Sequence, residues 1–556
     1  MIKRWLPIFL FSLFILATCA GVVGLISLKQ PFQIQDLLTF NDTNGDQLQG
    51  TYIPGTEPIG VIMLEGFGSD QIAMRPAASV FLEAGAHILT FDFSGHGRSA
   101  GALGFDNAAT DRLAYQAMAA KETFKSISGL ENDQILYFGH SLGGRVALQS
   151  AVLDPAPPRA LILLGTQVNL GTNIQAEFFT GTSDSDLDWV QSLSSQVPET
   201  DIFLLSGSWD DILTPQAAQA LYEKLTLNES GANASFVREL TIIPALVHNY
   251  EIYSTRLLRK MAEQLEDHDL VKFPNQISLS NVYFFWALTL IGLTGALSMA
   301  PGCLSRIRPL PTQPPLTTTI IRLRRFLWGK FIFWLPALPV SALLAGLFFF
   351  VPLYLPVFNM IYIGFIGGYG LLMLILYLIG KTPGTDGKWQ IRREKTSLTF
   401  SFKDLNLWLG GLIWVVILAT MILFTRTGFF YVIAANQRLL WLLIFSPITA
   451  LGFWIGERET KMVEVFRHES GRTLSWVPLV LSLIGLMPFF IYTVFMGILG
   501  SISGMIGGLQ SLLILGIVLL TGKVLSHFIH RDWIIAILQA VLLYALVLPQ
   551  GVLFAI

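Results

Sequence analysis

Long apolar runs are the feature that most constrains how this chain can fold. Hydrophobic residues make up 53% of its 556 residues and charged residues only 13%, whereas an ordinary soluble domain has about 25% charged residues. About 20 consecutive apolar residues are enough for a helix to cross a bilayer. Such runs lie near residues 281–300, 331–353, 358–380, 406–425, 439–456, 476–498, 506–522 and 533–555. The sequence therefore predicts an integral membrane protein.

The N-terminus adds a ninth apolar run. Met1-Ile2-Lys3-Arg4 is followed by apolar sequence from Trp5 to Leu28, longer than the roughly 7–15 apolar residues of a signal peptide. We therefore expect an uncleaved transmembrane anchor. The predicted organisation is an anchor over residues 1–30, a separate domain over 31–270, and a multi-pass membrane domain of about eight helices over 271–556. The predicted spans hold almost no acidic or basic residues, unlike those of many ion-coupled transporters.

Charge divides the chain into two halves that face different surroundings. Residues 31–270 hold 30 acidic and 12 basic residues, whereas residues 271–556 hold 8 acidic and 21 basic residues. An acidic domain argues against nucleic acid as a partner. If Lys3 and Arg4 are cytoplasmic, every later cytoplasmic loop is also basic, as the positive-inside rule requires. These loops carry Arg306, Arg308, Arg322, Arg324 and Arg325, then Lys381, Lys388, Arg392, Arg393 and Lys395, then Arg458, Lys461, Arg467 and Arg472, then Lys523 and Arg531. We therefore predict a cytoplasmic N-terminus, an extracytoplasmic domain over 31–270 and an extracytoplasmic C-terminus.

Within the acidic domain, short apolar runs alternate with segments of helical periodicity, a pattern typical of a mostly parallel sheet covered by helices. The predicted strands are 33–40, 47–54, 59–65, 87–93, 134–139, 160–165, 201–206 and 238–243. The predicted helices are 71–84, 108–126, 142–153, 215–226 and 249–266. Asn44-Gly45 favours a tight turn between the first two strands, which would make them antiparallel. The predicted fold class is α/β, with an eight-stranded sheet.

The segment Tyr137-Phe138-Gly139-His140-Ser141-Leu142-Gly143-Gly144 fits the G-x-S-x-G pattern of a strand-to-helix turn that presents a nucleophilic serine. The two glycines of the pattern avoid clashes in the sharp turn. A serine hydroxyl needs a base, and the base needs an orienting acid. Asp210 follows a predicted strand, and His248 follows the next one, in the order Ser, Asp, His that this architecture uses. His268 is the other later histidine of the domain, but it lies in the acidic linker beside the membrane.

These motifs together resemble the α/β-hydrolase superfamily, in particular its monoacylglycerol lipase and serine aminopeptidase branch. Asp92-Phe93-Ser94-Gly95-His96-Gly97-Arg98-Ser99 is similar to the D-x-x-G-x-G-x-S stretch of that branch, and the stretch from Gly207 to Asp210 to its G-x-x-D acid loop. The resemblance covers about residues 45–267. It implies an oxyanion hole formed by the backbone N–H groups of Phe67 and Leu142. The family usually has a histidine where this chain has Glu65, which leaves the hydrogen bonding of that loop open.

Each site residue also has a plain structural interpretation. Ser141 could be a helix N-cap, Asp211 could replace Asp210 as the acid, and His248 could be a loop histidine. We expect His96 and His140 to be packing residues, and Asp92 and Arg98 to hold their loop. The stretch of about 168–200, where this fold carries a lid, contains Phe178, Phe179 and Trp189 together with Glu177, Asp184, Asp186 and Asp188. No ligand cluster has metal-site spacing, so we expect neither a metal nor another cofactor.

The sequence thus predicts a membrane-bound extracytoplasmic serine hydrolase that cleaves a small-molecule or lipid ester through an acyl-enzyme. Membrane lipids are the expected partners, and the oligomeric state stays open. A serine peptidase is an alternative. A second alternative is a transporter or lipid-handling protein that uses the hydrolase fold as a binding domain.

Overall fold

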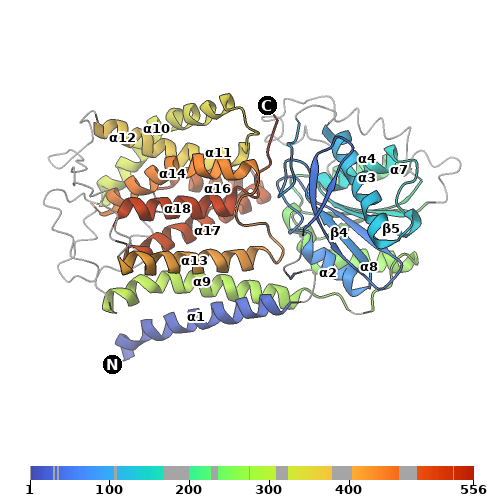
Figure 1. Ribbon diagram of the computed structural model, residues 1–556, viewed down its shortest axis with the longest axis horizontal. Coiled ribbons are helices and arrows are strands. Elements are labelled where there is room, and N and C mark those ends of the chain that lie inside the picture. The colour runs from blue at the N-terminus through green and yellow to red at the C-terminus, as the bar shows by residue number, and fades with distance from the viewer. Residues whose placement is uncertain are drawn as a thin grey trace.

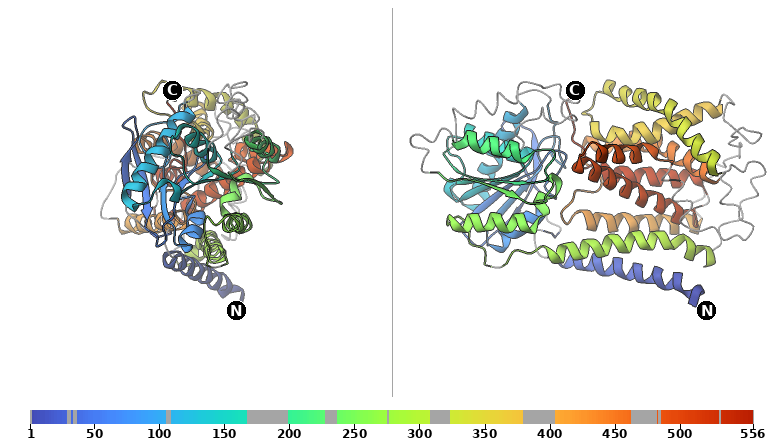
Figure 2. Two further views of the ribbon diagram at one scale, coloured as in Figure 1. Left: turned by 90° about the vertical axis from the view of Figure 1, so that its right-hand side faces the viewer. Right: turned by 180° about the vertical axis from the view of Figure 1, so that it is seen from behind.

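The computed structural model of the protein describes residues 2–28, 32–33, 37–104, 109–166, 199–226, 236–274, 276–307, 323–378, 404–461, 482, 485–529 and 531–555. The molecule consists of a sheet domain and a bundle of long helices. The sheet domain lies at one end of the bundle (Figure 1). The N-terminus lies at the end of the bundle far from the sheet, whereas the C-terminus lies between the two parts (Figures 1 and 2).

One eight-stranded sheet forms the centre of the sheet domain, with the strand order β1-β2-β4-β3-β5-β6-β7-β8. The strands are β1 (Leu38–Asn41), β2 (Gln47–Ile53), β3 (Gly60–Leu64), β4 (His87–Phe91), β5 (Ile135–His140), β6 (Ala160–Leu164), β7 (Asp201–Gly207) and β8 (Arg238–Ile243). Strand β2 pairs antiparallel with β1 and β4, and the pairs from β4 to β8 are parallel. The turn between β1 and β2 contains Gly45 with a φ of +85°, as Asn44-Gly45 predicts. The predicted α/β class is confirmed.

Helices cover both faces of this sheet (Figure 2). They are α2 (Arg75–Glu83), α3 (Ala109–Ser128), α4 (Leu142–Leu153), α7 (Pro215–Thr226) and α8 (Thr255–Asp267). Strand side chains alternate between two apolar cores: Val61 and Met63 belong to one, and Ile62 and Leu64 to the other. Because both faces of the central strands β3, β5 and β6 are buried, these strands are almost continuously apolar, which is why their positions can be predicted from sequence.

Two predicted helices start later than the sequence suggests. The predicted helix 71–84 begins at Arg75. The predicted helix 249–266 is divided: a 3-10 turn, η3, covers His248–Tyr253, and α8 begins at Thr255. The Ser254 hydroxyl accepts a hydrogen bond from the Leu257 N–H and so caps α8. Apolar periodicity alone does not separate the short turn from the helix that follows it.

The described residues contain seven helical segments long and apolar enough to cross a membrane, which agrees with a membrane protein. They are Trp5–Ser27, Ser280–Leu304, Phe326–Phe350, Val357–Leu376, Leu405–Thr425, Gln437–Glu459 and Ile502–Leu525. The corresponding helices are α1 (Ile2–Ser27), α9 (Ser280–Ile307), α10 (Leu323–Leu347), α11 (Met360–Tyr362) with α12 (Gly368–Leu378), α13 (Leu405–Thr425), α14 (Gln437–Lys461) and α17 (Ile502–Leu525). Two shorter apolar helices, α16 (Met487–Ile498) and α18 (Asp532–Val547), complete the described part of the bundle.

The predicted span 533–555 is wrong at its C-terminal end. Helix α18 ends at Val547, and Val552 and Phe554 are buried in the core of the sheet domain. The Leu553 backbone pairs with that domain, donating to Gly95 O at 2.8 Å and accepting from the Leu103 N–H at 2.8 Å. Hydropathy does not distinguish a lipid-facing helix from an apolar tail that packs on a protein. Of the predicted span 476–498, residues 476–481 and 483–484 lie outside the described residues, as do residues 168–198 of the predicted lid over about 168–200.

The bundle also contains charged residues that the predicted spans left out. Lys330 of α10 and Glu459 of α14 form a buried ion pair, and both also hydrogen-bond to the Tyr369 hydroxyl. Both charges belong to helices that extend further than predicted at the end away from the sheet (Figure 1). Lys330 and Tyr369 line a small cavity of about 40 Å³, together with Trp334, Glu457 and Gln539. The expectation of spans almost without charge therefore needs correction at this end.

Candidate active site

Ser141 lies at the sharp turn between β5 and α4, at the carboxyl edge of the sheet. Its φ of 56° and ψ of −116° form a sparsely populated backbone conformation for a residue with a side chain. Such conformations cluster at functional sites. Ser141 occupies the N-cap position of α4, but among the described residues its side chain makes no capping hydrogen bond. The geometry is that of the predicted nucleophile turn and does not support the capping interpretation.

The two glycines of the motif allow this turn to pack closely. A Cβ atom on Gly143 would lie 2.1 Å from Leu64 O, and one on Gly139 would lie 2.4 Å from Gly143 O. Both distances are far below any real contact, so side chains at these positions would push the turn away from β3. The predicted role of both glycines is confirmed.

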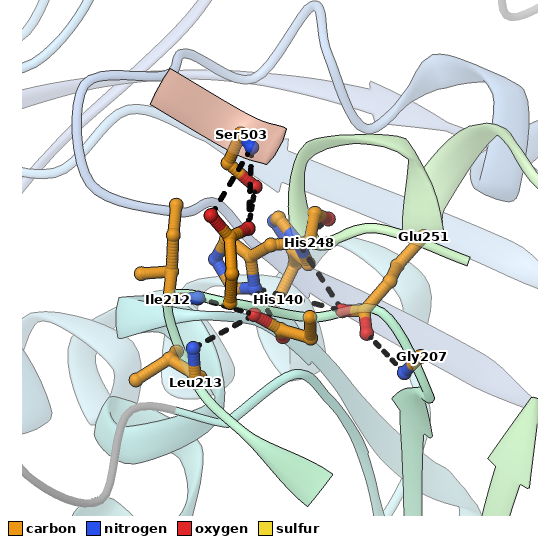
Figure 3. A network of polar contacts seen from close by, with 9 residues as sticks. His140, Gly207, Ile212, Leu213, His248, Glu251 and Ser503 are labelled. Carbon is orange, nitrogen blue, oxygen red and sulfur yellow. Dashed lines mark hydrogen bonds and ion pairs between the residues drawn. The ribbon is translucent and has the colours of Figure 1, made fainter. Parts of the chain in front are cut away.

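Asp210 and His248 meet at the same edge of the sheet because they follow the neighbouring parallel strands β7 and β8. His248 Nδ1 lies 2.7 Å from Asp210 Oδ2. Asp210 Oδ1 accepts the N–H groups of Ile212 at 2.9 Å and Leu213 at 2.7 Å, which fixes the carboxylate (Figure 3). Asp211 faces the helix bundle instead. The structure therefore brings Asp210, and not Asp211, to the histidine.

The charge around His248 makes its imidazole more basic than usual. Burial by itself lowers the pKa of this group, but the hydrogen bond and charge of Asp210 raise it, and the charges of Glu251 and Asp211 raise it further. The balance raises the pKa above its ordinary value. An imidazole that binds a proton strongly is suited to act as a general base and then to hold that proton.

Two residues that the sequence analysis did not assign to the site lie against His248. The His140 ring stacks on the His248 ring with centroids 4.9 Å apart. Glu251 lies one turn after His248 in η3, with Oε2 3.9 Å from His248 Nδ1 and 3.6 Å from His140 Nε2 (Figure 3). His140 was expected to be a packing residue, and its ring does pack, on the imidazole of the candidate site. The i, i+3 spacing of His248 and Glu251 is a signal for this contact, but only once a helical turn is known there.

The loop that carries Phe67 packs directly on the nucleophile turn. A Cβ atom on Gly66 would lie 3.3 Å from the Ser141 Cβ, so the backbone next to Phe67 is as close to Ser141 as packing permits. Leu142 is the first residue of α4, where a backbone N–H has no acceptor within the helix. These positions are compatible with an oxyanion hole formed by the two N–H groups, which stays a prediction.

Glu65 is completely buried beside this loop. Its Oε1 accepts the N–H of Phe93 at 2.9 Å and thereby joins the Phe67 loop to the loop after β4. Burial raises the pKa of this carboxyl well above its ordinary value, and the neighbouring Asp92 and Asp70 raise it further. These surroundings favour the neutral form of Glu65 over the charged one.

Asp92 holds the loop after β4, as predicted. Its carboxylate accepts the N–H groups of Gln71 at 2.8 Å and Arg98 at 2.9 Å. His96 is buried and its Nδ1 lies 3.3 Å from Ser94 O. Burial lowers the pKa of His96 to about 4, which agrees with a neutral packing residue.

Comparison with known proteins agrees with this architecture. Residues 58–184 match the profile of the family described as serine aminopeptidase, S33, and the sheet has the strand order and the nucleophile turn of the α/β-hydrolase fold. The chain carries an α/β-hydrolase domain. An uncharacterized protein of Mycobacterium tuberculosis is 35% identical over 125 residues, which are 22% of this chain and 41% of that protein. The chain thus spans less than half of this relative.

Solved structures similar to the hydrolase domain include an esterase and an α/β-hydrolase domain-containing protein. A Pyrococcus furiosus esterase is 18% identical with a TM-score of 0.34, over 42% of this chain and 90% of the esterase. The mouse α/β-hydrolase domain-containing protein 10 is 17% identical with a TM-score of 0.31, over 42% of this chain and 98% of the mouse protein.

Three loops of the hydrolase domain that carry site residues contact the helix bundle. Asp211, next to the acid Asp210, accepts hydrogen bonds from the Ser501 hydroxyl at 2.8 Å and the Ser503 N–H at 3.2 Å at the start of α17 (Figure 3). The Tyr250 hydroxyl, two residues after His248, accepts a hydrogen bond from Gln510 at 3.4 Å. The third loop carries the Phe67 ring, which packs on two rings of the bundle half, Phe358 at 5.5 Å and Phe554 at 6.0 Å between centroids. The candidate site therefore faces the bundle.

Among the described residues, His140, His248 and Glu251 lie close enough together to hold a metal ion, with their ligand atoms within 4.8 Å of one another. The Nδ1 atom that His248 would offer already contacts Asp210. The same three groups also fit a different arrangement, in which the Glu251 carboxylate and the His140 ring surround the His248 imidazole.

Proposed function

We propose that this chain is a membrane-bound serine hydrolase that cleaves carboxylic esters of lipids or other acyl compounds through an acyl-enzyme. The observation that carries the proposal is the contact between Asp210 and His248 at the same sheet edge as the strained Ser141. A nucleophile turn, a base and an orienting acid, in the order that the fold uses, make up the machinery of acyl transfer.

In the proposed reaction, the Ser141 hydroxyl attacks the ester carbonyl while His248 takes its proton. Asp210 orients the imidazole and stabilises its positive charge. The backbone N–H groups of Phe67 and Leu142 stabilise the oxyanion of the tetrahedral intermediate. His248 then gives the proton to the departing alcohol as the carbon–oxygen bond breaks. Water, activated by His248, hydrolyses the acyl-enzyme and regenerates Ser141.

A lipid substrate is favoured because the site lies where membrane spans begin. Asp211 contacts the first residues of the span Ile502–Leu525, and Phe67 packs on Phe358, the second residue of the span Val357–Leu376. The ends of spans lie at the border between the hydrocarbon core and the headgroups. The ester groups of glycerolipids lie at that same depth. The Phe67 side chain is 42% exposed at this border and offers an apolar surface to an acyl chain.

We further propose that the hydrolase domain lies outside the cytoplasm. The bundle end far from the hydrolase domain carries the N-terminus and the basic residues Arg324, Arg458 and Lys523 of helices α10, α14 and α17 (Figure 1). The positive-inside rule favours the cytoplasm for that end. The hydrolase domain lies at the opposite end.

A serine peptidase is the second candidate, because the matching family profile is described as a serine aminopeptidase. The same nucleophile, base and oxyanion donors would serve amide cleavage, so the residues of the site do not separate the two reactions.

The test is hydrolysis by the purified full chain in detergent of p-nitrophenyl acyl esters and of aminoacyl p-nitroanilides. Our proposal predicts ester hydrolysis that increases with an apolar acyl chain, and little anilide hydrolysis. Ser141→Ala and Asp210→Asn are the controls, and we expect both to lower the rate by about 10³-fold or more. Preferred cleavage of the anilides would support the peptidase instead, and equal rates for Ser141→Ala and the wild type would remove both.

A further inference from the structure

We propose that Glu251 is a second carboxylate serving the imidazole of His248, a positioning residue that works beside Asp210 and is itself held by Gly207 and His140. This inference rests on the proposed function, since it assigns a role within the same site. It follows from the buried position of Glu251 at the carboxyl edge of the sheet, between Gly207, Gly165 and His140.

Glu251 joins the loop of the base to the loop of the acid. Its side chain is completely buried, and Oε1 accepts the N–H of Gly207 at 2.7 Å (Figure 3). Gly207 is the last residue of β7 and begins the turn that carries Asp210. A buried carboxylate needs hydrogen bonds of this kind to offset the cost of its desolvation. The contact keeps the turn of Asp210 and the turn of His248 in register.

The second oxygen of Glu251 faces the two imidazoles. Oε2 lies 3.9 Å from His248 Nδ1 and 3.6 Å from His140 Nε2. Within the described part of the chain it accepts no hydrogen bond. The space it occupies depends on Gly165, at the end of β6, because a Cβ atom there would lie 2.1 Å from Glu251 Oε2 and 2.9 Å from His248 Nδ1.

His140 completes the niche from the side of the nucleophile. Its ring stacks on His248, and its Nε2 lies 3.2 Å from the backbone oxygen of His248 as well as facing Glu251. Among the described residues, the charged or titratable groups around His248 are Asp210, Asp211, Glu251 and His140, which come from the ends of β5 and β7 and from η3.

Two carboxylates next to Nδ1 have a definite chemical consequence. When His248 takes the proton of Ser141, the imidazolium gains the attraction of Glu251 in addition to its bond to Asp210. Because the site is buried, this attraction is weakly screened. If Asp210 loses its charge, Glu251, with Oε2 3.9 Å from His248 Nδ1, is a carboxylate of the described residues that can still stabilise the imidazolium.

The experiment measures how fast a fluorophosphonate probe labels the full-length protein in detergent, from acidic to alkaline pH, for the wild type, Glu251→Gln, Asp210→Asn and the double variant. Labelling requires neutral His248, so its acid limb reports the pKa of that group. Glu122→Gln, which alters an exposed glutamate of α3, is the matched control.

We expect Glu251→Gln to shift the acid limb to lower pH and to lower the plateau rate by roughly tenfold. We also expect the same change to lower the labelling rate more in the Asp210→Asn background than in the wild type. In that background His248 no longer has the carboxylate of Asp210 and depends on that of Glu251. Glu122→Gln should match the wild type. If Glu251→Gln does not fold, Glu251→Asp serves instead, since its shorter carboxylate withdraws from Nδ1 and should give a smaller shift in the same direction.

An acid limb that stays in place in these variants, with equal losses in both backgrounds, would overturn the role of Glu251. A wild-type protein that does not label would instead overturn the proposed function, so the two failures are distinguishable.

Discussion

Among the single residues, Glu65 has an unusual environment, since a completely buried carboxyl group joins the Phe67 loop to Phe93. The pKa of Glu65 lies well above its ordinary value of 4.5 because of burial and because Asp92 and Asp70 are close. Asp70 itself has a pKa raised to about 8, mainly by burial. The folded protein therefore binds protons more tightly at these groups than the unfolded chain does. The contribution of each group to stability is fully present below its ordinary pKa, 4.5 for Glu65 and 3.8 for Asp70, and for Asp70 it is lost as the pH rises through about 8.

Because burial favours the neutral form of Glu65, we predict that Glu65→Gln keeps the structure and the activity. A glutamine offers the same acceptor to the Phe93 N–H and cannot ionise. We expect its melting temperature to equal that of the wild type at acidic pH and to exceed it at alkaline pH, where the wild type must bury a charge. Glu65→Ala should instead lose about 1–3 kcal/mol, because the Phe93 N–H loses its acceptor. Thermal unfolding in detergent across the pH range measures both, and a glutamine variant less stable than the wild type at alkaline pH would contradict the assignment.

The sequence could predict that Ser141, Asp210 and His248 lie at one edge of the sheet because each follows a strand of a parallel sheet, and Ser141 and Asp210 also lie in recognisable motifs. It could not predict Glu251 or the placement of His140. Their contact depends on a 3-10 turn after β8 and on the missing side chain of Gly165, which is on a different strand. Tertiary contacts of this kind leave no local pattern.

Among the elements, helix α17 has a special place because its N-terminus is bound by the loop that carries Asp210, the candidate acid. Asp211 accepts hydrogen bonds from the Ser503 N–H and from the hydroxyls of Ser501 and Ser503. A carboxylate at a helix N-terminus is stabilised by unpaired backbone N–H groups and by the helix dipole. The contact therefore links the position of Asp210 to a membrane-spanning helix.

We predict that Asp211→Asn weakens both the fold and the activity. The loss of charge at the helix N-terminus should cost about 0.5–2 kcal/mol, and a looser acid loop should lower the rate of ester hydrolysis several-fold. Asp133→Asn, an exposed aspartate before β5, is the matched control and should have no effect on either. Unfolding temperature and ester hydrolysis in detergent are the measurements. Wild-type values for both in Asp211→Asn would show that α17 does not support the acid loop.

The buried ion pair of Lys330 and Glu459 gives a prediction for the stability of the bundle. Removing one partner leaves a buried charge without compensation, so Lys330→Met should destabilise the protein by about 3–5 kcal/mol. Changing both, with Lys330→Met and Glu459→Gln, should recover most of that loss. The measurement is the free energy of unfolding in detergent. A double variant that is no more stable than Lys330→Met would contradict the role of the ion pair.

The boundaries of the central strands β3 to β7 could be predicted to within about two residues, because each is a short run of mostly apolar residues that is buried on both faces. The first strand begins at Leu38, five residues later than predicted, and is partly exposed. The boundaries of the membrane helices were less predictable. Hydropathy counts apolar residues but does not show what covers them, so Val552 and Phe554 were assigned to a span although they pack in the hydrolase domain. The same limitation moved Lys330 and Glu459 out of the predicted spans.

On the scale of the whole molecule, the hydrolase domain and the bundle are held together from both ends of the bundle sequence. Helix α9 follows the hydrolase domain directly, whereas Leu553 at the other end pairs with Gly95 and Leu103. The loops that carry the candidate site lie at this junction. Under the proposed function, this arrangement would give a reason for the many spans, because they would hold the loops of the site at the depth of lipid esters.

The proposed orientation predicts which positions a membrane-impermeant maleimide can reach in intact cells. In a background with Cys19 and Cys303 changed to serine, a cysteine at Asp133 in the hydrolase domain should react, and a cysteine at Arg324 at the far end of the bundle should react only after the cells are opened. The opposite pattern would place the hydrolase domain in the cytoplasm.

The central claim is that Ser141 is an activated nucleophile, and labelling with a fluorophosphonate probe tests it most directly. The probe forms a covalent bond only with a serine whose proton is removed by a neighbouring base. We predict that the wild-type protein labels in membranes, that Ser141→Ala does not label, and that His248→Asn labels at least 10²-fold more slowly. Equal labelling of the wild type and Ser141→Ala would contradict the account.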